Sequence, residues 1–223
     1  ADSLTRESKK SVRERKRGEV IRLDIQKKLN HDFKKLITDE LSVSDNEIFE
    51  YEDLLGFDQL SEVYGNIQNK KLNYKKFKPR FPERIKDFGG DCFAAILKKD
   101  LLVHHPFESF DVVVSFLQQA ARDPQVIAIK QTLYRTSDQS PIIEALTRAA
   151  ENGKSVTAVV ELKAWFDEEK NLKWAENLEK AGVQVVYGFM NLKIHAKVSM
   201  VIRREKNKLN HYIHFGTGNY HPQ

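Results

Sequence analysis

Three short apolar runs, VIAI at residues 126–129, VTAVV at 156–160 and VQVVY at 183–187, decide the fold of this 223-residue chain. They are rich in β-branched residues and have the length of buried strands. The segments between them carry helix signals. Ser140-Pro141 opens the first helix and Gly153 closes it, and Asp167 and Gly182 bound the second. A strand–helix–strand–helix–strand order predicts a parallel sheet covered by helices.

Further elements are expected on both sides of these runs. Downstream, strands over 196–202 and 211–215 joined by the polar stretch 203–210 predict a hairpin. Upstream, Ser109 can cap a helix whose apolar residues recur at helical spacing. The chain therefore reads as an α/β domain over 99–223, with a mixed sheet flanked by helices.

Residues 1–98 read as a smaller α+β portion. Strands are expected over 20–25 and 47–51, and helices up to about Arg17 and over 30–41, 57–64 and 93–97. The lysine-rich stretch 66–89 contains Pro79 and Pro82 and predicts an extended connector. The domain boundary is placed near residue 99.

Composition excludes several classes of protein. Hydrophobic residues make up 40% of the chain and charged residues 31%, which is enough apolar material for a core. No apolar run approaches the roughly 18 residues that span a bilayer, and no signal peptide is visible, so we expect no transmembrane segment. The single cysteine, Cys92, excludes an internal disulfide and a cysteine-rich zinc site and suits a reducing compartment.

The formal net charge is +5, and the charges are segregated along the chain. Residues 39–62 carry nine acids and no Lys or Arg, whereas residues 70–80 carry six bases and no acid. A second basic cluster lies at 13–17. Such runs can be a solvated face or a contact for a polyanion, and the sequence leaves both open.

The segment Leu192-Lys193-Ile194-His195-Ala196-Lys197-Val198 is the most informative for chemistry. On a strand, side chains alternate, so His195 and Lys197 are expected on one face, extended by Lys193. Ala196, Val198, Met200 and Ile202 are expected on the opposite, apolar face. The lysines would attract phosphate oxygens near the histidine.

The next strand ends in Phe215-Gly216-Thr217-Gly218-Asn219. Its glycines let backbone N–H groups approach a ligand, and Asn219 adds a polar side chain. The H-x-K pattern followed by G-T-G-N resembles half of the site of the phospholipase D superfamily, which uses a histidine nucleophile on phosphorus. That superfamily commonly has an Asp five residues after the Lys, where this chain has Ile202.

A longer series of motifs is more specific. In order along the chain these are HHPFESF at 104–110, AIKQTLYR at 128–135, VELKA at 160–164, LKIHAK at 192–197 and GTGNY at 216–220. The series closely resembles the bacterial polyphosphate kinase family, densely from Asp91 to Tyr220 and more loosely in the earlier portion, which fits that family's head domain. The resemblance implies a phospholipase D-like sheet for residues 99–223.

The resemblance also implies an activity. His195 would be phosphorylated by ATP and pass the phosphoryl group reversibly to inorganic polyphosphate, with ADP released. Arg135 would belong to the site that holds phosphate and Mg²⁺. Because a guanidinium cannot donate a lone pair to a metal, we expect Arg135 to bind phosphate beside the ion. Lys193, Lys197 and Asn219 would bind phosphate as well.

The family's other properties are expected of the full-length protein. They are a homo-oligomeric state, no nucleic-acid partner, and a cytoplasmic location with peripheral association at the membrane. Family members are several times longer, with a second phospholipase D-like half that supplies another histidine and the nucleotide contacts. We therefore expect this chain to be an internal fragment that does not turn over ATP by itself.

One residue of the site departs from the family. Trp165 stands where the family usually has a second arginine, so it either removes a phosphate ligand or serves in packing. Two other functions remain open. One is a phospholipase D-type phosphodiesterase half-site, against which Ile202 weighs, and the other is a non-catalytic module that binds polyanions through 13–17 and 70–80.

Overall fold

A computed structural model describes residues 10, 18–53, 55–67, 69–75, 77–134, 140–161, 168–188 and 192–220. The chain divides into two compact units, of which one includes Arg13–Phe77 and the other Lys78–Gln223. The domain boundary near residue 99 stays a prediction.

The first unit contains a small parallel β-sheet. Strands β1 (Leu23–Gln26) and β2 (Ile48–Tyr51) pair in parallel, and helix α2 (His31–Leu41) connects them. The Asn30 side chain caps α2 by accepting hydrogen bonds from the backbone N–H groups of Asp32 and Phe33. The remaining elements are the short helices η1 (Asp45–Glu47), η2 (Phe57–Gln59), α3 (Leu60–Asn66) and η3 (Lys70–Leu72). The helix predicted over 30–41 and the strand predicted over 47–51 are confirmed.

The second unit is built on a five-stranded mixed sheet in the order β5-β4-β3-β6-β7. Strands β3 (Val126–Leu133), β4 (Ser155–Val160) and β5 (Gln184–Tyr187) are parallel, as the three apolar runs predict. Strands β6 (Lys197–Glu205) and β7 (Lys208–Gly216) form the predicted antiparallel hairpin, and β6 pairs antiparallel with β3. The hairpin strands extend through most of the polar stretch 203–210, where the sequence predicts a connector.

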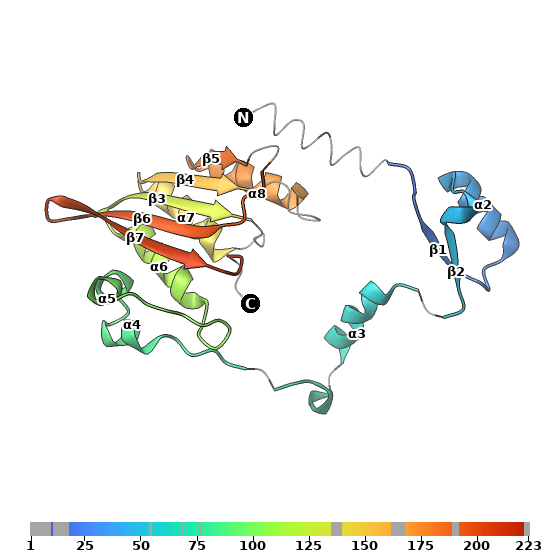
Figure 1. Ribbon diagram of the computed structural model, residues 1–223, viewed down its shortest axis with the longest axis horizontal. Helices are drawn as coiled ribbons and strands as arrows, with labels where there is room; N and C mark the ends of the chain where they lie inside the picture. The colour runs from blue at the N-terminus through green and yellow to red at the C-terminus, as the bar shows by residue number, and fades with distance from the viewer. Residues whose placement is uncertain are drawn as a thin grey trace. The chain divides into compact units, whose positions relative to one another are not determined.

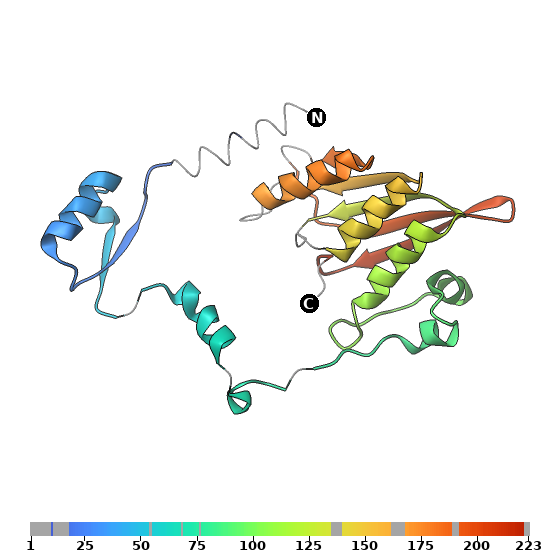
Figure 2. The same ribbon diagram turned by 180° about the vertical axis from the view of Figure 1, so that it is seen from behind.

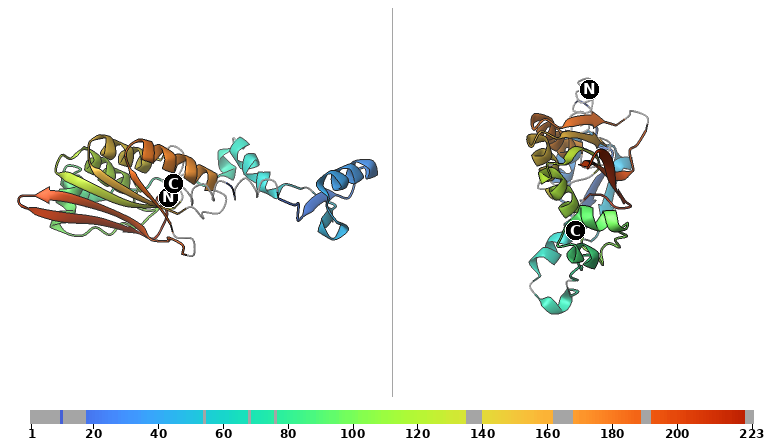
Figure 3. Two further views of the ribbon diagram at one scale, coloured as in Figure 1. Left: turned by 90° about the horizontal axis from the view of Figure 1, so that it is seen from above. Right: turned by 90° about the vertical axis from the view of Figure 1, so that its left-hand side faces the viewer.

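Helices pack on one face of this sheet. Figures 1 and 2 show α6 (Asp111–Arg122), α7 (Pro141–Glu151) and α8 (Glu168–Lys180) side by side on that face, and Figure 3 shows the same layering from above. Leu117, Leu146 and Leu178, one from each helix, are fully buried. Burying such a side chain contributes about 1.5–3 kcal/mol, so these leucines hold the helical layer on the sheet. Two short helices precede α6, namely α4 (Glu83–Asp87) and α5 (Cys92–Lys98). The first of them lies within the predicted connector.

The predicted faces of the hairpin strand are wrong in one respect. Lys197, Ser199 and Val201 are buried, whereas Val198, Met200 and Ile202 are only half-buried. Val201 lies beside the buried Ile129 of β3, which belongs to the face that the helices cover. Val198, Met200 and Ile202 therefore face away from the helical layer, and Lys197 lies on the face that the helices cover.

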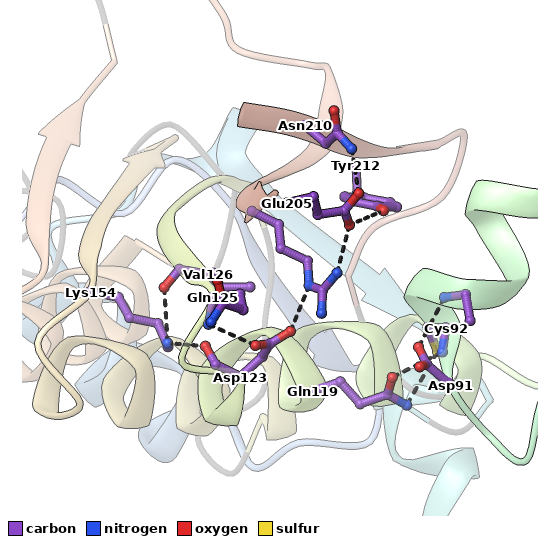
Figure 4. Close-up of polar contacts among 12 residues, drawn as sticks. Asp91, Cys92, Gln119, Asp123, Gln125, Val126, Lys154, Glu205, Asn210 and Tyr212 are labelled. Carbon is purple, nitrogen blue, oxygen red and sulfur yellow. Dashed lines mark hydrogen bonds and ion pairs between the residues drawn. The ribbon is translucent and has the colours of Figure 1, made fainter. Parts of the chain in front are cut away.

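The far end of the sheet is fastened by polar contacts, shown in Figure 4. Arg203 in β6 bridges Asp123, which follows α6, at 2.7 Å and Glu205 at 2.6 Å. Glu205 also accepts hydrogen bonds from Asn210 and Tyr212 of β7. The Lys154 ammonium donates to the backbone carbonyl oxygen of Val126 at 3.0 Å. These contacts tie the start of β3, the end of β6 and β7 together at the end opposite the predicted site.

Candidate active site

The residues predicted to carry the chemistry lie where β3 ends, β6 begins and β7 ends. Because β3 and β6 run antiparallel, the segment that precedes Lys197 lies beside Tyr134, which directly follows β3. Lys197 is the direct cross-strand partner of Gly216, which places the glycine turn at the same edge. Sites in α/β proteins gather at the carboxyl ends of parallel strands, and this edge includes those ends of β3 and β4.

Tyr134, directly after β3, lies at the centre of this cluster. The Nζ atoms of Lys193 and Lys197 lie 5.3 and 5.2 Å from the centroid of its ring. The His195 ring meets it edge-on with 6.0 Å between the ring centroids. Cations within about 6 Å of an aromatic face are attracted by its quadrupole. The structure therefore brings Lys193, His195 and Lys197 together around one aromatic ring that the sequence analysis did not select.

His195 precedes the hairpin strand instead of lying on it. Residues 192–196 are not paired as a strand, and β6 begins at Lys197. This corrects the expectation that His195 and Lys197 share one face of the same strand. His195 and Lys193 are exposed, whereas Lys197 is 5% exposed. The Lys197 ammonium donates a 2.6 Å hydrogen bond to the carbonyl oxygen of His195, so it holds the backbone of the histidine in place.

The backbone around His195 is held by two side chains from neighbouring strands. Glu161, at the end of β4, is 2% exposed and accepts a 2.6 Å hydrogen bond from Ile194 N–H. The Thr132 hydroxyl donates to the carbonyl oxygen of Ala196 at 2.7 Å and accepts from Val198 N–H at 2.9 Å. Neither residue was predicted. The sequence signal that could have found them is a polar residue at the end of an apolar strand.

The glycine turn after β7 sits over a buried polar cluster. The Tyr220 hydroxyl lies 2.9 Å from Ser199 Oγ and 2.8 Å from His214 Nδ1. Burial raises the pKa of Tyr220 to about 12 and lowers the pKa of His214 to about 4, with a smaller effect of His105 on His214. Tyr220 thus fixes the end of the turn that contains Asn219. The Asn219 side chain is half-buried.

Gly216 is required by close packing. A Cβ atom at Gly216 would lie 3.2 Å from Cε1 of His214 and 3.5 Å from the Cβ of Lys197. The glycine leaves room for the His214 ring, which is a different reason from the backbone approach to a ligand that the sequence suggests.

Two residues singled out from the sequence cannot be placed. Arg135 and Trp165 lie outside the residues that the structure describes. The phosphate-binding roles of Arg135, Lys193, Lys197 and Asn219 stay predictions. Among the described residues, no group of three or more His, Cys, Asp or Glu side chains is arranged to hold a metal ion. Within the same residues, no helix combines the length and the hydropathy needed to cross a membrane.

Comparison with known proteins gives a consistent result. A family model described as polyphosphate kinase C-terminal domain 1 matches residues 91–223, and one described as polyphosphate kinase middle domain matches residues 1–63. A polyphosphate kinase of Erythrobacter litoralis is 49% identical over 100% of this chain, which covers 31% of that protein. One of Streptomyces coelicolor is 42% identical over 100% of the chain and 30% of its own length.

A solved structure is also similar. The crystal structure of the polyphosphate kinase from Porphyromonas gingivalis superposes with a TM-score of 0.66 at 28% identity, over 83% of this chain and 28% of that one. The fold is of the phospholipase D-like type, as the sequence predicted. The chain spans less than a third of the length of the curated relatives named above. With one family model covering residues 91–223 and a second covering 1–63, this chain belongs to the polyphosphate kinase family.

Proposed function

We propose that the full-length parent of this chain transfers the terminal phosphoryl group of ATP to inorganic polyphosphate through a phosphohistidine at His195. Family membership supports the reaction. The observation that supports the residue is the gathering of His195, Lys193 and Lys197 around Tyr134 at the edge where β3 ends. An exposed histidine beside two cations suits attack on an anionic phosphate.

The reaction has two steps. The lone pair of His195 Nε2 forms a bond to the γ-phosphorus of ATP while the bond from that phosphorus to the bridging oxygen breaks, and ADP leaves with the electron pair. An oxygen at the end of a polyphosphate chain then attacks the same phosphorus. The N–P bond breaks and its electrons return to the histidine. Each step breaks one bond to phosphorus and forms another, so the reaction can run in either direction.

The protein's main contribution is position and charge. Phosphoryl transfer spreads negative charge over the equatorial oxygens, and fixed positive groups stabilise that charge. Lys193 is exposed next to His195 and can reach a bound phosphate. Lys197 is nearly buried, and its positive charge acts from the protein interior next to the His195 backbone. Arg135 and Asn219 are proposed to bind phosphate oxygens at the same edge.

Mg²⁺ is proposed to reach the site with the nucleotide. The described residues around His195 are two lysines, a tyrosine and the buried Glu161, which already accepts from Ile194 N–H. That set does not fit a protein cage of oxygen ligands, whereas Mg²⁺ commonly keeps waters and binds substrate phosphates.

The test is labelling of the full-length parent with ATP that carries a γ-³²P phosphoryl group. The wild type should acquire an acid-labile, base-stable label, and His195→Ala should acquire none. His211→Ala is the matched control, because His211 is an exposed histidine of β7 and should label normally. Undiminished labelling of His195→Ala would refute the assignment. Cleavage of a phosphodiester without any labelling would favour the phosphodiesterase alternative.

A further inference from the structure

The segment that carries His195 lies beyond the end of the β3–β6 ladder. The last paired residues of that ladder are Gln131 and Ser199, so residues 192–198 have no strand partner on the β3 side. On the other side, β7 pairs only with Lys197 and the residues that follow it. A segment bonded along one side for only part of its length would move unless side chains replaced the missing backbone bonds.

Thr132 replaces two of those bonds. It follows Gln131 in β3, and its hydroxyl bridges the carbonyl oxygen of Ala196 at 2.7 Å and the N–H of Val198 at 2.9 Å. One hydroxyl can donate once and still accept, so both contacts are satisfied together. A β-branched side chain has few χ1 rotamers, which fixes the hydroxyl in space. Thr132 therefore anchors the backbone directly after His195.

Glu161 anchors the backbone directly before His195. Its own N–H donates to the carbonyl oxygen of Leu133 at 2.9 Å, which ties it to the end of β3. Its carboxylate accepts from Ile194 N–H at 2.6 Å in a site where Glu161 is 2% exposed. Low solvent access strengthens such a hydrogen bond.

We propose that Thr132 and Glu161 are positioning residues that hold His195 at the geometry for attack on phosphorus. The proposal rests on the proposed function. Together they fix the backbone at positions 194, 196 and 198, on both sides of a histidine whose own side chain is exposed. A misplacement of about 1 Å in a reacting group can cost about 10²-fold in rate. Loss of either anchor should therefore slow the chemical step more than it weakens ATP binding.

The decisive pair of variants in the full-length parent is Thr132→Val and Thr132→Ser. Valine has the shape of threonine without the hydroxyl, and serine keeps the hydroxyl. In single-turnover labelling, Thr132→Val should form phosphohistidine about 10–100-fold more slowly, with the ATP dissociation constant changed less than about threefold. Thr132→Ser should stay within about threefold of the wild type. Thr157→Val is the control, because it makes the same substitution in the neighbouring strand β4 away from His195.

Glu161 is tested with Glu161→Gln, which keeps an oxygen that can accept from Ile194 N–H, and Glu161→Met, which removes the acceptor. The glutamine variant should retain more of the labelling rate than the methionine variant. If Glu161→Met does not fold, the two Thr132 variants decide. Wild-type labelling by Thr132→Val, or equal slowing in Thr132→Val and Thr132→Ser, would overturn the positioning role.

Amide hydrogen exchange of peptides covering residues 192–198 separates this inference from the reaction itself. Thr132→Val should exchange faster at the Val198 amide than the wild type does, and Thr157→Val should not. If the wild-type parent takes no label, the proposed function fails. The exchange measurement then still decides whether Thr132 holds the segment, and unchanged exchange in Thr132→Val overturns that claim.

Discussion

The Lys197 ammonium donates to the carbonyl oxygen of His195, so the lysine of the H-x-K pattern holds the backbone of the histidine. The sequence pattern predicts that Lys193 and Lys197 both reach toward a bound phosphate. In the structure, Lys193 is the exposed lysine beside His195, whereas Lys197 is nearly buried beneath it. The two lysines should therefore respond differently to substitution.

Lys197→Met should affect both stability and activity. It keeps most of the aliphatic stem but removes the donor to His195 O, and a hydrogen bond to a charged group contributes about 1.5–3 kcal/mol. We expect the free energy of unfolding of the chain to fall by about 1–2 kcal/mol in urea titrations, and phosphohistidine formation in the parent to slow. Lys193→Met is the control, with slower labelling and an unchanged free energy of unfolding. Equal stability of the two variants would contradict this distinction.

His214 should make the stability of the chain depend on pH. Its folded pKa of about 4 lies below the ordinary histidine value of 6.5, so the unfolded chain binds the extra proton first as pH falls. The free energy of unfolding should therefore drop between pH 6.5 and pH 4 and level off below. Allowing for the partial exposure of His214, the drop is about 2 kcal/mol.

The measurement is urea unfolding of the wild type and of His214→Gln at pH 7 and pH 5. The variant should lose part of the pH dependence that the wild type shows over this range. His211→Gln, an exposed histidine on the same strand, should keep the wild-type dependence. If the His214 and His211 variants behave alike, His214 is not the titrating group.

Gly216→Ala and Gly218→Ala form a matched pair in the turn after β7. A Cβ at Gly216 would meet His214 at 3.2 Å, whereas a Cβ at Gly218 has no heavy atom within 4 Å. Relief of the first contact must shift the His214 ring or the backbone of β7. We expect Gly216→Ala to lower the free energy of unfolding by about 1–2 kcal/mol and Gly218→Ala to change it little. A thermal melt of both variants suffices, and identical midpoints would show that the turn accommodates the methyl group.

Trp165→Arg in the full-length parent tests the departure from the family pattern. If position 165 contacts the transferring phosphate, restoring the arginine adds a planar cationic donor and should raise kcat by up to about 10²-fold. Lys173→Arg is a control, because it introduces the same guanidinium at an exposed position of α8. Equal rates for the tryptophan and arginine enzymes would leave Trp165 as a packing residue.

The elements that depend on local pattern were predictable. The runs at 126–129, 156–160 and 183–187 became the parallel strands because β-branched runs between capped helices have few other ways to pack. The hairpin was predictable because two strand-like runs follow each other, joined by a polar stretch. Its strands are longer than predicted because residues 203–205 pair with residues 208–210 across the ladder, and Glu205 accepts hydrogen bonds from Asn210 and Tyr212.

The contacts between distant residues were not predictable. Strand alternation places Val198, Met200 and Ile202 together on one apolar face, but the face of β6 that is buried is set by the side on which α6 and α7 pack. Tyr134, Thr132 and Glu161 acquire their roles only because β3 and β4 end next to the start of β6. Residues that are distant in the sequence become neighbours only when the strands pair, so local sequence patterns do not predict these contacts.

The Thr132–Ala196 hydrogen bond has a consequence for how the protein is made, because its partners are 64 positions apart in the chain. Closing a flexible loop of that size costs roughly 4 kcal/mol of chain entropy, so the bond forms only after the intervening helices and strands have collapsed. Ribosomes deliver the chain from the N-terminus, and β3 waits for β6 until residues beyond 200 have emerged. The histidine site therefore cannot be completed before Ala196 and the strand that follows it have been synthesised.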